Sequence, residues 1–485
     1  MTIRDWLEGL SYKLVQGSLD VEVNEVVYDS RKAAPGAVFV CMKGTKIDSH
    51  DFVGQVTDAG VKVLVTEHAV EAPADVTVVE TANGREALAL LSAARFGYPS
   101  RKLTMIGVTG TKGKTTTTHM IKTILETAGK KTGMIGTNGV YIGEEHFPTV
   151  NTTPESYDLH RYFAKMVEEG CACCVMEVSS QAMKMHRVAG IQFDYGLFTN
   201  ISPDHIGKDE HADFAEYLYY KKQLFAQSKR ALVNVDDEHI EEIVKDIPCP
   251  WTGFGLKEGA GFQAENIHYV SEPDFVGVEF DIKGEHQIPV RVSIPGKFNV
   301  YNALAAAAVT LWVGVPADKL QHALEHLKIN GRMEIVYTSE KCCVIVDYAH
   351  NAVSMESLLE TLREYHPKRL VVVFGCGGNR SKDRRYSMGE IGGRMADLSI
   401  ITADNSRFEK VEDIIADIRG SIEKTGGSFL EIPDRKEAIA YSITHAEPGD
   451  MIAIIGKGHE DYQEINGVRY PFLDRAVVEE VVKNL

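Results

Sequence analysis

The sequence lacks an apolar run of bilayer length and any excess of positive charge. Its most apolar helical stretch, Ala303–Val315, is shorter than the ~20 residues of a transmembrane helix, so it predicts a buried helix. Charges within Met1–Leu10 argue against a targeting signal, and a cytoplasmic location is expected. The formal net charge of −17 argues against binding to nucleic acid or anionic membranes, although a local cluster of Arg and Lys still suits an anionic substrate.

Cysteines are also few, with eight among 485 residues. Most of them lie in apolar strand-like runs, which favours reduced thiols in the core. The close spacing of cysteines in Cys171-Ala-Cys-Cys174 resembles a metal-binding motif. Adjacent strand residues point to opposite faces, however, so no metal is expected there. With 44% hydrophobic and 25% charged residues, the chain has the composition of a globular protein, and its length suggests about three domains of ~150 residues.

The strongest functional signal lies between residues 103 and 118. The apolar run Leu103–Val108 predicts a buried parallel strand, followed by a glycine-containing loop and a helix that begins near Lys114. Glycines let backbone N–H groups approach phosphate oxygens, the helix N-terminus and the lysine add positive potential, and a threonine hydroxyl suits Mg²⁺. Val108 stands where the strict phosphate-loop pattern has glycine, so the match is to a shorter form that predicts ATP or GTP binding. The residues expected at the nucleotide are Gly110, Thr111, Lys112, Gly113, Lys114, Thr115 and Thr116.

The chain before this loop forms a first unit, residues 1–99, with strands expected at Val61–Thr66 and Val76–Glu80. Ser30 and Arg31 follow a short strand in it. That pair suits an anionic group, and a turn with an exposed salt bridge is an equal alternative. A linker is expected at Tyr98-Pro-Ser100, because proline disfavours helix at the residue before it.

A second unit, residues 100–330, alternates strands and helices as a parallel α/β sheet does. Further strands are expected at Cys174–Ser180, Phe193–Thr199 and Ala231–Val235. Polar residues gather at the strand ends, where open α/β sheets place their ligands: Glu177, Ser179, Asn200, Asp204 and His205.

Two of these strand-end residues, Glu177 and His205, are candidate Mg²⁺ ligands. The hard ion prefers oxygen, so Asp204 remains an alternative to His205, and a structural role remains open for either. Lys221 and Lys222 lie on a predicted helix, and such lysines are solvated surface charges by default.

A third unit, residues 331–485, predicts another α/β sheet, with buried strands at 343–347, 370–374, 398–402 and 451–455. Polar loops follow the four strands: Asp347–Asn351, Gly375–Arg385, Asp404–Glu409 and Gly456–Glu460. Two loops carry glycines for close backbone approach, and arginines suit bidentate recognition of carboxylate or phosphate. The loops therefore predict a second site.

Ten short motifs occur along the chain in a recognisable order. They are Gly110–Thr116, Asn151–Pro154, Met176–Ser180, His186–Val188, Thr199–His205, Gly296–Asn302, Gly331-Arg332, Asp347–His350, Asp404–Arg407 and Gly456–Glu460. Through them the chain resembles the Mur ligases of peptidoglycan synthesis over essentially its full length, and among these the ligases of the third amino acid. The resemblance implies a three-domain α/β architecture. Residues 1–99 would bind the UDP sugar. A central P-loop-type parallel-sheet domain (100–330) would bind ATP, and a Rossmann-like C-terminal domain (331–485) would bind the amino acid.

The resemblance also implies a role for each matching residue. Contacts to the UDP-muramoyl dipeptide are implied for Ser30, Asn151, Thr152, Thr153, Ser179 and Arg187. ATP phosphates and Mg²⁺ are implied for Lys114 and Thr115, the metal ions for Glu177 and His205, and the rest of the nucleotide for Asn302, Arg332 and Asp347. Lys221 matches the family lysine that CO₂ carbamylates, a change that replaces a cation beside Mg²⁺ with an anionic oxygen ligand. Only Lys222 then keeps the surface interpretation.

The third amino acid is predicted from Asp404-Asn-Ser-Arg407. In relatives that use meso-diaminopimelate, this arginine pairs with the distal carboxylate, which lysine lacks. The contacts implied for that amino acid are Arg385, Asp404, Asn405, Ser406, Arg407, Gly456 and Glu460. A buried arginine left unpaired rejects the wrong substrate, by about 10⁴-fold. Meso-diaminopimelate is therefore predicted, with L-lysine or L-ornithine as alternatives.

Three departures from the family pattern stand out. Ser406 replaces the usual proline and is expected to loosen its loop, Met185 replaces glutamine beside His186, and the loop Asp204–His211 is longer than the common form.

The implied reaction is ATP-dependent amide formation on UDP-N-acetylmuramoyl-L-Ala-D-Glu through an acyl phosphate. ATP, Mg²⁺ and a CO₂-derived carbamate on Lys221 are the implied cofactors. Neither binding to nucleic acid nor membrane insertion is expected. The protein is expected to be a monomer. One alternative is a ligase like folylpolyglutamate synthase, which shares the central and C-terminal domains but leaves residues 1–99 unexplained. The other is a nucleotide-binding protein without turnover.

Overall fold

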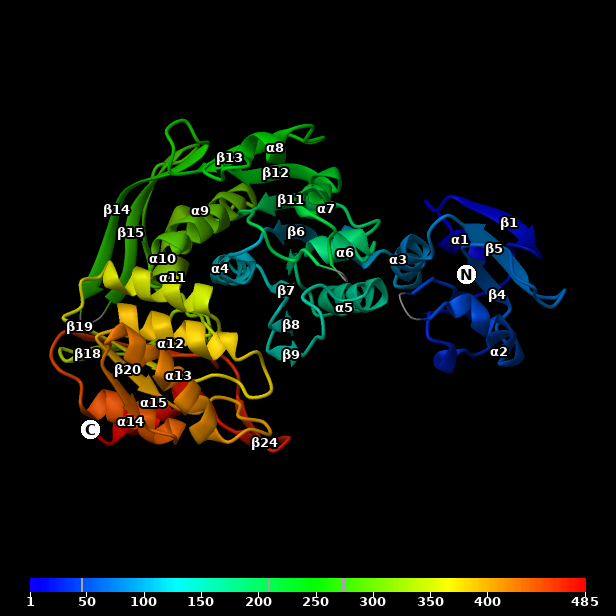
Figure 1. The fold of residues 1–485 in the computed structure, drawn as a ribbon. Helices are drawn as coiled ribbons and strands as arrows, with labels where there is room; N and C mark the ends of the chain where they lie inside the picture. Colours follow the sequence, from blue (N-terminus) through cyan, green and yellow to red (C-terminus); the bar gives the residue numbers. More distant parts are fainter. Residues whose placement is uncertain (45–46, 208–209, 273–274) are drawn as a thin grey trace. The chain divides into compact units, whose positions relative to one another are not determined.

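The structure is a computed structural model that describes the whole chain except residues 45–46, 208–209 and 273–274. It comprises two compact units, residues 1–263 with 304–320 and residues 264–303 with 321–485. Sheets with helices packed against them make up both units, so the predicted α/β class is confirmed (Figure 1). The three-domain boundaries stay a prediction, because these units divide the chain at other positions.

The N-terminal sheet has the order β1-β5-β4-β3-β2, with β1 antiparallel to β5 and the other pairs parallel. Its strands are β1 (Tyr12–Gln16), β2 (Glu25–Val27), β3 (Ala37–Val40), β4 (Val63–Thr66) and β5 (Thr77–Thr81). Helices α1 (Ile3–Trp6), α2 (Val53–Asp58) and α3 (Gly84–Arg95) accompany them. Successive β3 residues enter opposite cores, Val38 with α3 and Phe39 with α2, which explains a continuously apolar strand.

The central sheet follows the order β13-β12-β11-β6-β10-β7-β8-β9 and is parallel from β13 to β7. These strands are β6 (Thr104–Thr109), β7 (Thr132–Gly136), β8 (Gly139–Ile142), β9 (Glu145–Phe147), β10 (Cys173–Glu177), β11 (Phe193–Phe198), β12 (Ser228–Asn234) and β13 (Trp251–Gly255). The helices are α4 (Lys114–Thr127), α5 (Ser156–Glu168), α6 (Ser180–Lys184), α7 (Phe214–Ala226) and α8 (Ile240–Val244). The expected strands and the helix start at Lys114 are confirmed.

The next elements are strands β14 (Phe262–Glu272), β15 (Phe275–Gly284) and β16 (Ile288–Val292), then helices α9 (Lys297–Trp312) and α10 (Ala317–Glu325). Helix α9 contains the expected apolar run from Ala303 to Trp312 and ends three residues before the predicted end at Val315, and Ala303 to Val309 are fully buried. Among the described residues, no helix combines the length and apolarity needed to cross a bilayer.

The C-terminal sheet has the order β17-β18-β22-β19-β20-β21, and only β17 is antiparallel to its neighbour. Its strands are β17 (Glu334–Thr338), β18 (Cys342–Asp347), β19 (Arg369–Phe374), β20 (Leu398–Ile401), β21 (Phe429–Glu431) and β22 (Asp450–Ile455). Along β18, Ile345 packs with helices α11 (Ala352–Arg363), α12 (Asp383–Met395) and α13 (Val411–Thr425). Its neighbour Val344 packs with α14 (Arg435–Thr444) and α15 (Asp474–Lys483), so both faces are covered. The four strands expected here are confirmed. A small hairpin of β23 (Tyr462–Ile465) and β24 (Val468–Pro471) was not predicted.

All eight cysteines are free, and every one except the half-buried Cys249 is buried. Burial raises the pKa of Cys174 well above that of an ordinary thiol, as expected for a core residue. Among the described residues, the only cluster of three metal-capable side chains is Asp48, His50 and His68. His50 uses both ring nitrogens already, Nδ1 in a 2.5 Å hydrogen bond to Asp48 and Nε2 as acceptor of the Glu67 N–H at 3.0 Å. That geometry does not favour a metal site.

Candidate functional site

The predicted phosphate loop lies between β6 and α4. Gly110 has φ 145°, and a Cβ there would lie 2.0 Å from Thr199 Oγ1, so glycine is required. Lys112 and Asn200 close the loop through a mutual pair of bonds: the Lys112 N–H donates to Asn200 Oδ1 and Asn200 Nδ2 donates to the Lys112 carbonyl, both at 2.9 Å. The loop is therefore fixed to the end of β11 with the N-terminus of α4 behind it, an arrangement suited to an anion.

Two lysines converge on this loop. Lys114 Nζ donates to the Gly110 carbonyl at 2.8 Å, and Lys221 Nζ, from α7, donates to the same oxygen at 2.7 Å. Burial lowers the pKa of both amines, and the charge of Lys114 lowers that of Lys221 further, to well below its usual value. Two ammonium groups facing one oxygen would repel each other, which favours the neutral amine at the more buried Lys221. Lys221 is 2% exposed, so its default interpretation as a surface charge is wrong.

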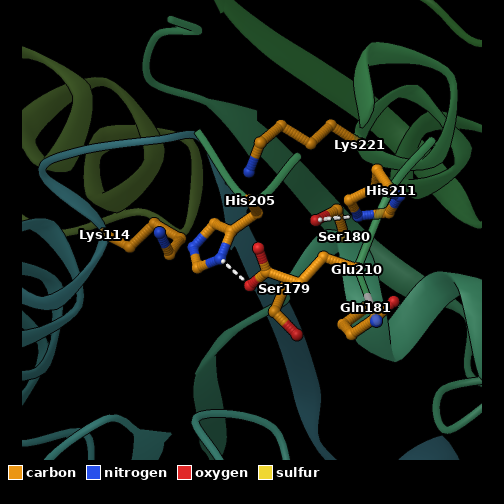
Figure 2. A pocket seen from close by; sticks show the side chains of 8 residues that line it. All are labelled: Lys114, Ser179, Ser180, Gln181, His205, Glu210, His211 and Lys221. Atoms are coloured by element: carbon orange, nitrogen blue, oxygen red, sulfur yellow. Dashed lines mark hydrogen bonds and ion pairs between the residues drawn. The ribbon is translucent and has the colours of Figure 1, made fainter. Parts of the chain in front are cut away.

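Both lysines line one cavity of about 60 Å³, shown in Figure 2. The residues around it are Lys114, Ser179, Ser180, Gln181, His205, Glu210, His211 and Lys221. Two hydrogen bonds of 2.9 Å fix its wall, one between His205 Nδ1 and Glu210 and one between His211 Nε2 and the Ser180 hydroxyl. The structure thus brings His205 to the phosphate-loop lysines, as predicted for a strand-end residue. Lys208 and Asp209 of the long loop lie outside the described residues.

Glu177 occupies a different position, buried at the end of β10. Its Oε1 accepts from the Thr115 hydroxyl at 2.9 Å and from the Thr137 N–H at 3.0 Å, and its Oε2 accepts from the Thr137 hydroxyl at 3.2 Å. A buried carboxylate beside a threonine hydroxyl directly after the phosphate-loop lysine is a donor set that fits Mg²⁺. Thr137 was not predicted, because it follows β7, a strand that the sequence analysis did not identify.

Four of the residues expected at the UDP-muramoyl dipeptide cluster around Thr153. Its hydroxyl donates to the Glu177 carbonyl at 2.9 Å and accepts from the Ser179 N–H at 3.1 Å, and Arg187 donates to its carbonyl at 3.1 Å. Thr152 bonds to Thr137 through its hydroxyl at 3.1 Å. Asn151 is exposed at the start of this segment.

Two groups of predicted contacts remain, namely Ser30 and the set of Asn302, Arg332 and Asp347. Ser30 opens a short 3₁₀ helix (Ser30–Lys32), and the neighbouring Arg31 forms the exposed salt bridge, 2.7 Å from Asp29. Around β18, both Asp347 oxygens accept backbone N–H groups at 2.7 Å, from Met333 and Ala349, and Arg332 stacks over the Tyr348 ring. Burial raises the pKa of Asp347. In α9, Asn302 Nδ2 donates to Asn299 at 3.0 Å.

The loops after β19, β20 and β22 meet at one edge of the C-terminal sheet, as the parallel order requires. The Gly378 N–H donates to the Asn405 carbonyl, and Asn405 Nδ2 donates to Glu460, both at 2.9 Å. A Cβ on Gly456, where φ is 113°, would lie 2.7 Å from an oxygen of Asp404, so glycine lets these two loops approach. The predicted second site is thus a real cluster of polar side chains.

Arg407 lies at the centre of this cluster in left-handed backbone conformation, with φ 51°. Its Nη1 donates to the Gly378 carbonyl at 2.9 Å, and its Nε lies 3.5 Å from Glu464. The hairpin holds the backbone on both sides, since the Arg407 N–H donates to the Glu464 carbonyl at 3.0 Å and the Asn466 N–H donates to the Arg407 carbonyl at 2.6 Å. The guanidinium therefore keeps N–H groups for a carboxylate while its chain position is fixed.

The loop around Ser406, which was expected to be looser without proline, is held by hydrogen bonds on both sides of the serine. The residue is 3% exposed, and the loop is bonded on both sides of it, at the Asn405 carbonyl and the Arg407 N–H. The neighbouring strand and loops hold this conformation, and the loosening expected from the loss of proline stays a prediction.

Replacing Ser406 with proline is therefore expected to leave turnover and amino-acid preference unchanged. Among the described residues, no hydrogen bond uses the Ser406 N–H, so proline removes no bond, and the stability gain is at most about 1 kcal/mol. Kinetics with each amino acid and a thermal melt test this. A large loss of stability or a changed preference would contradict it.

Arg385, expected to contact the amino acid, is neutralised within the protein. It is 1% exposed, with Nη2 bonded to both carboxylate oxygens of Glu409 at 2.8 Å and Nη1 to Asp417 at 2.9 Å. Glu409 in turn accepts a hydrogen bond from the Asn379 N–H. Arg385 is therefore linked to the glycine loop through Glu409. Glu409 and Asp417 hold the guanidinium in this arrangement, and its direct contact with the amino acid stays a prediction.

Sequence reasoning missed another arginine on the same loop. A Cβ on Gly377 would lie 3.9 Å both from Arg380 Cγ and from Arg407 Nη1, so the two arginines flank one glycine. Arg380 is exposed, unlike Arg385. The signal was available, because Arg380 directly follows the turn after the two glycines.

Comparison with known proteins agrees with these two clusters. Three family profiles match in order: "Mur ligase family, catalytic domain" over residues 22–96, "Mur ligase middle domain" over 108–310 and "Mur ligase, glutamate ligase domain" over 331–458. The chain is 39% identical to the UDP-N-acetylmuramoyl-L-alanyl-D-glutamate–2,6-diaminopimelate ligase of Clostridium perfringens, covering 100% of both. The chain is 40% identical to UDP-N-acetylmuramoyl-L-alanyl-D-glutamate–2,6-diaminopimelate ligase 1 of Clostridium acetobutylicum, again covering 100% of both.

Solved structures give the same picture. A structure of a ligase with that name superposes with a TM-score of 0.78 at 26% identity, covering 100% of this chain and 99% of that one. Folylpolyglutamate synthase of Mycobacterium tuberculosis has a TM-score of 0.57 at 16% identity and covers only 75% of this chain, which shows a shared fold alone. On full-length similarity and on the order of its domains, this chain belongs to the Mur ligase family.

Proposed function

We propose that this chain is an ATP-dependent amide ligase that joins meso-diaminopimelate to UDP-N-acetylmuramoyl-L-Ala-D-Glu in the synthesis of the peptidoglycan precursor. The observation that carries the proposal is a pair of lysines that meet at the phosphate loop: the half-buried Lys114 at the start of α4 and the buried Lys221 of α7 both donate to the Gly110 carbonyl. The names of its full-length relatives support the choice of substrates. The charged loops of the C-terminal sheet support a zwitterionic acceptor.

The chemistry begins with a poor electrophile. The side-chain carboxylate of D-glutamate attacks the γ-phosphorus of ATP. The bond between this phosphorus and the bridging oxygen breaks, ADP leaves, and an acyl phosphate forms. The amine of the third amino acid then attacks the carbonyl carbon, and the tetrahedral intermediate expels phosphate. In such transfers the protein contributes positioning and charge stabilisation. Lys114 and the backbone N–H groups of residues 110–114 would serve the transferred phosphoryl group.

The metal and carbamate proposals rest on donor chemistry. Thr115 and Glu177 would hold Mg²⁺ through oxygen atoms, and His205 remains the candidate ligand from the pocket side. The ion supplies neutralisation of phosphoryl charge when bound. A buried amine of lowered pKa, as at Lys221, is more often neutral and hence able to react with CO₂. The resulting carbamate would give the pocket an anionic oxygen ligand.

The amino-acid loops offer complementary charges. Among the described residues no hydrogen bond is given to Arg407 Nη2, so this group is available for the distal carboxylate of meso-diaminopimelate, with Arg380 beside it. Glu460 and Asp404 offer carboxylates for ammonium groups, and Asn405, Ser406 and Gly456 shape the loops. Arg385 is proposed to contact the amino acid while Glu409 and Asp417 hold its guanidinium.

The remaining roles are proposed from the family resemblance and from the observed clusters. Thr152, Thr153, Ser179 and Arg187, with Asn151 and Ser30, would bind the UDP-muramoyl dipeptide. Asn302, Arg332 and Asp347 would bind the nucleotide beyond its phosphates. A monomer in the cytoplasm is proposed.

Isotope transfer tests this proposal directly. With ¹⁸O in the D-glutamyl side-chain carboxylate, an acyl-phosphate route moves one ¹⁸O into the released phosphate, and release requires ATP, the UDP-dipeptide and the amino acid together. Phosphate without ¹⁸O would overturn the route. Release with a folate and glutamate instead would favour the alternative ligase, and nucleotide binding without any release would favour the non-catalytic one.

A further inference from the structure

Lys457 is a fully buried lysine in the loop after β22, and no role has yet been given to it. Its side chain is 0% exposed. Its Nζ donates to Asn405 Oδ1 at 3.1 Å and to Glu460 Oε2 at 3.2 Å, and it lies 5.3 Å from the centre of the Tyr462 ring. An ammonium group withdrawn from water needs such partners, so its position is tied to these two side chains.

The lysine fixes which way the Asn405 carboxamide faces. Asn405 Oδ1 accepts from Lys457 and also from the Glu464 N–H at 2.9 Å, while Nδ2 donates to Glu460 Oε2 at 2.9 Å. Turning the amide over would place its NH₂ against two donors and its oxygen against a carboxylate. The ammonium charge therefore selects one orientation.

The lysine also determines which oxygen of Glu460 remains available. Both Lys457 and Asn405 bond to Oε2, and among the described residues no hydrogen bond reaches Oε1. The Glu460 side chain is 20% exposed. One carboxylate oxygen is thus held inside the protein while the other can accept from an ammonium group outside it.

We propose that Lys457 is the positioning residue of the amino-acid site: it holds Asn405 and Glu460 so that Glu460 Oε1 faces the amino group of the incoming diamino acid. This inference rests on the proposed function. The alternative is that Lys457 only stabilises the fold. Stability alone does not separate the two roles, because removing one partner of a buried ion pair destabilises a fold in either case; selectivity among the three substrates does.

The test replaces Lys457 with methionine, which keeps the length of the side chain and removes the charge. The KM for meso-diaminopimelate is expected to rise by roughly 10²-fold, because small misplacements of a binding group cost that much. The KM values for ATP and for UDP-dipeptide should stay unchanged, while the melting temperature falls, because Glu460 and Asn405 lose a buried partner. Lys457→Arg, which keeps the charge, should recover part of the loss. The matched control is Lys436→Met, an exposed lysine 2.8 Å from Glu480 on the surface of α14, which should change nothing.

Two kinetic results would overturn the proposal. One is an unchanged KM for the amino acid in Lys457→Met. The other is a rise of similar size in the KM values for all three substrates, which marks a purely structural role.

A crystal structure of Lys457→Met separates this inference from the proposed function, because it needs no turnover. Glu460 displaced from Asn405 supports positioning by Lys457, even if the wild-type protein fails to use any amino acid tested and the proposed function fails. The same 2.9 Å contact retained without the lysine would overturn the inference, whatever the activity.

Discussion

Replacing Lys221 with alanine is expected to lower turnover by about 10²–10³-fold, the usual cost of removing one preorganised charge-stabilising group. The side chain is buried against the Gly110 carbonyl, and as a carbamate it would offer an anionic oxygen next to the phosphate loop. Binding of ATP should persist, because Lys114 and the loop backbone remain. Single-turnover kinetics and equilibrium nucleotide binding measure the two effects separately.

The carbamate itself is tested by rescue. Short-chain carboxylates such as acetate and propionate should restore part of the activity of Lys221→Ala, since they return an anionic oxygen to the pocket. The neighbouring Lys222 provides the matched control, because its Nζ donates away from the phosphate loop, to the carbonyls of Glu242 and Lys245. No rescue in a variant that still binds ATP, or an equal loss in Lys222→Ala, would count against a carbamate on Lys221.

Replacing Arg407 with alanine is expected to abolish the preference for meso-diaminopimelate over L-lysine. A guanidinium left without its carboxylate is the source of the discrimination, so a preference of about 10⁴-fold should collapse towards parity. The loss should fall on kcat/KM for meso-diaminopimelate, while kcat/KM for L-lysine stays constant or rises. Competition between the two amino acids for one enzyme sample measures the ratio.

Arg469 supplies the control for this prediction. It lies on β24 of the same hairpin, with its guanidinium 4.3 Å from the centre of the Tyr462 ring, so Arg469→Ala changes a nearby charge without touching the loop of residues 404–407. A preference unchanged in Arg407→Ala, or lost equally in Arg469→Ala, would show that selection does not depend on the pairing of Arg407 with a carboxylate.

The sequence predicted the parallel strands well, because runs such as those of β18 and β22 are short and continuously apolar. Such runs are typical of parallel strands that are buried on both faces of a sheet. It also placed the functional loops at their ends. Strands β7–β9 and the hairpin β23–β24 escaped, since they are short, contain glycine or polar residues, and are defined by pairing partners rather than by their own pattern.

The individual side chains were harder to predict than the loops. Lys221 could be assigned only by family resemblance, because periodicity alone makes it a surface residue like Lys222. Arg385 and Arg380 occupy the same polar stretch, and only the structure reveals that Glu409 and Asp417 already neutralise the first. Such pairing depends on long-range packing, which spacing along the chain does not encode.

The most direct test of the whole account is phosphate release from ATP and Mg²⁺ with UDP-N-acetylmuramoyl-L-Ala-D-Glu, supplied separately with meso-diaminopimelate, L-lysine or L-ornithine. We expect release with meso-diaminopimelate and almost none with the other two. Release with lysine or ornithine instead would contradict the role given to Arg407 while leaving the ligase intact. No phosphate release with any of the three amino acids would contradict the proposed reaction itself.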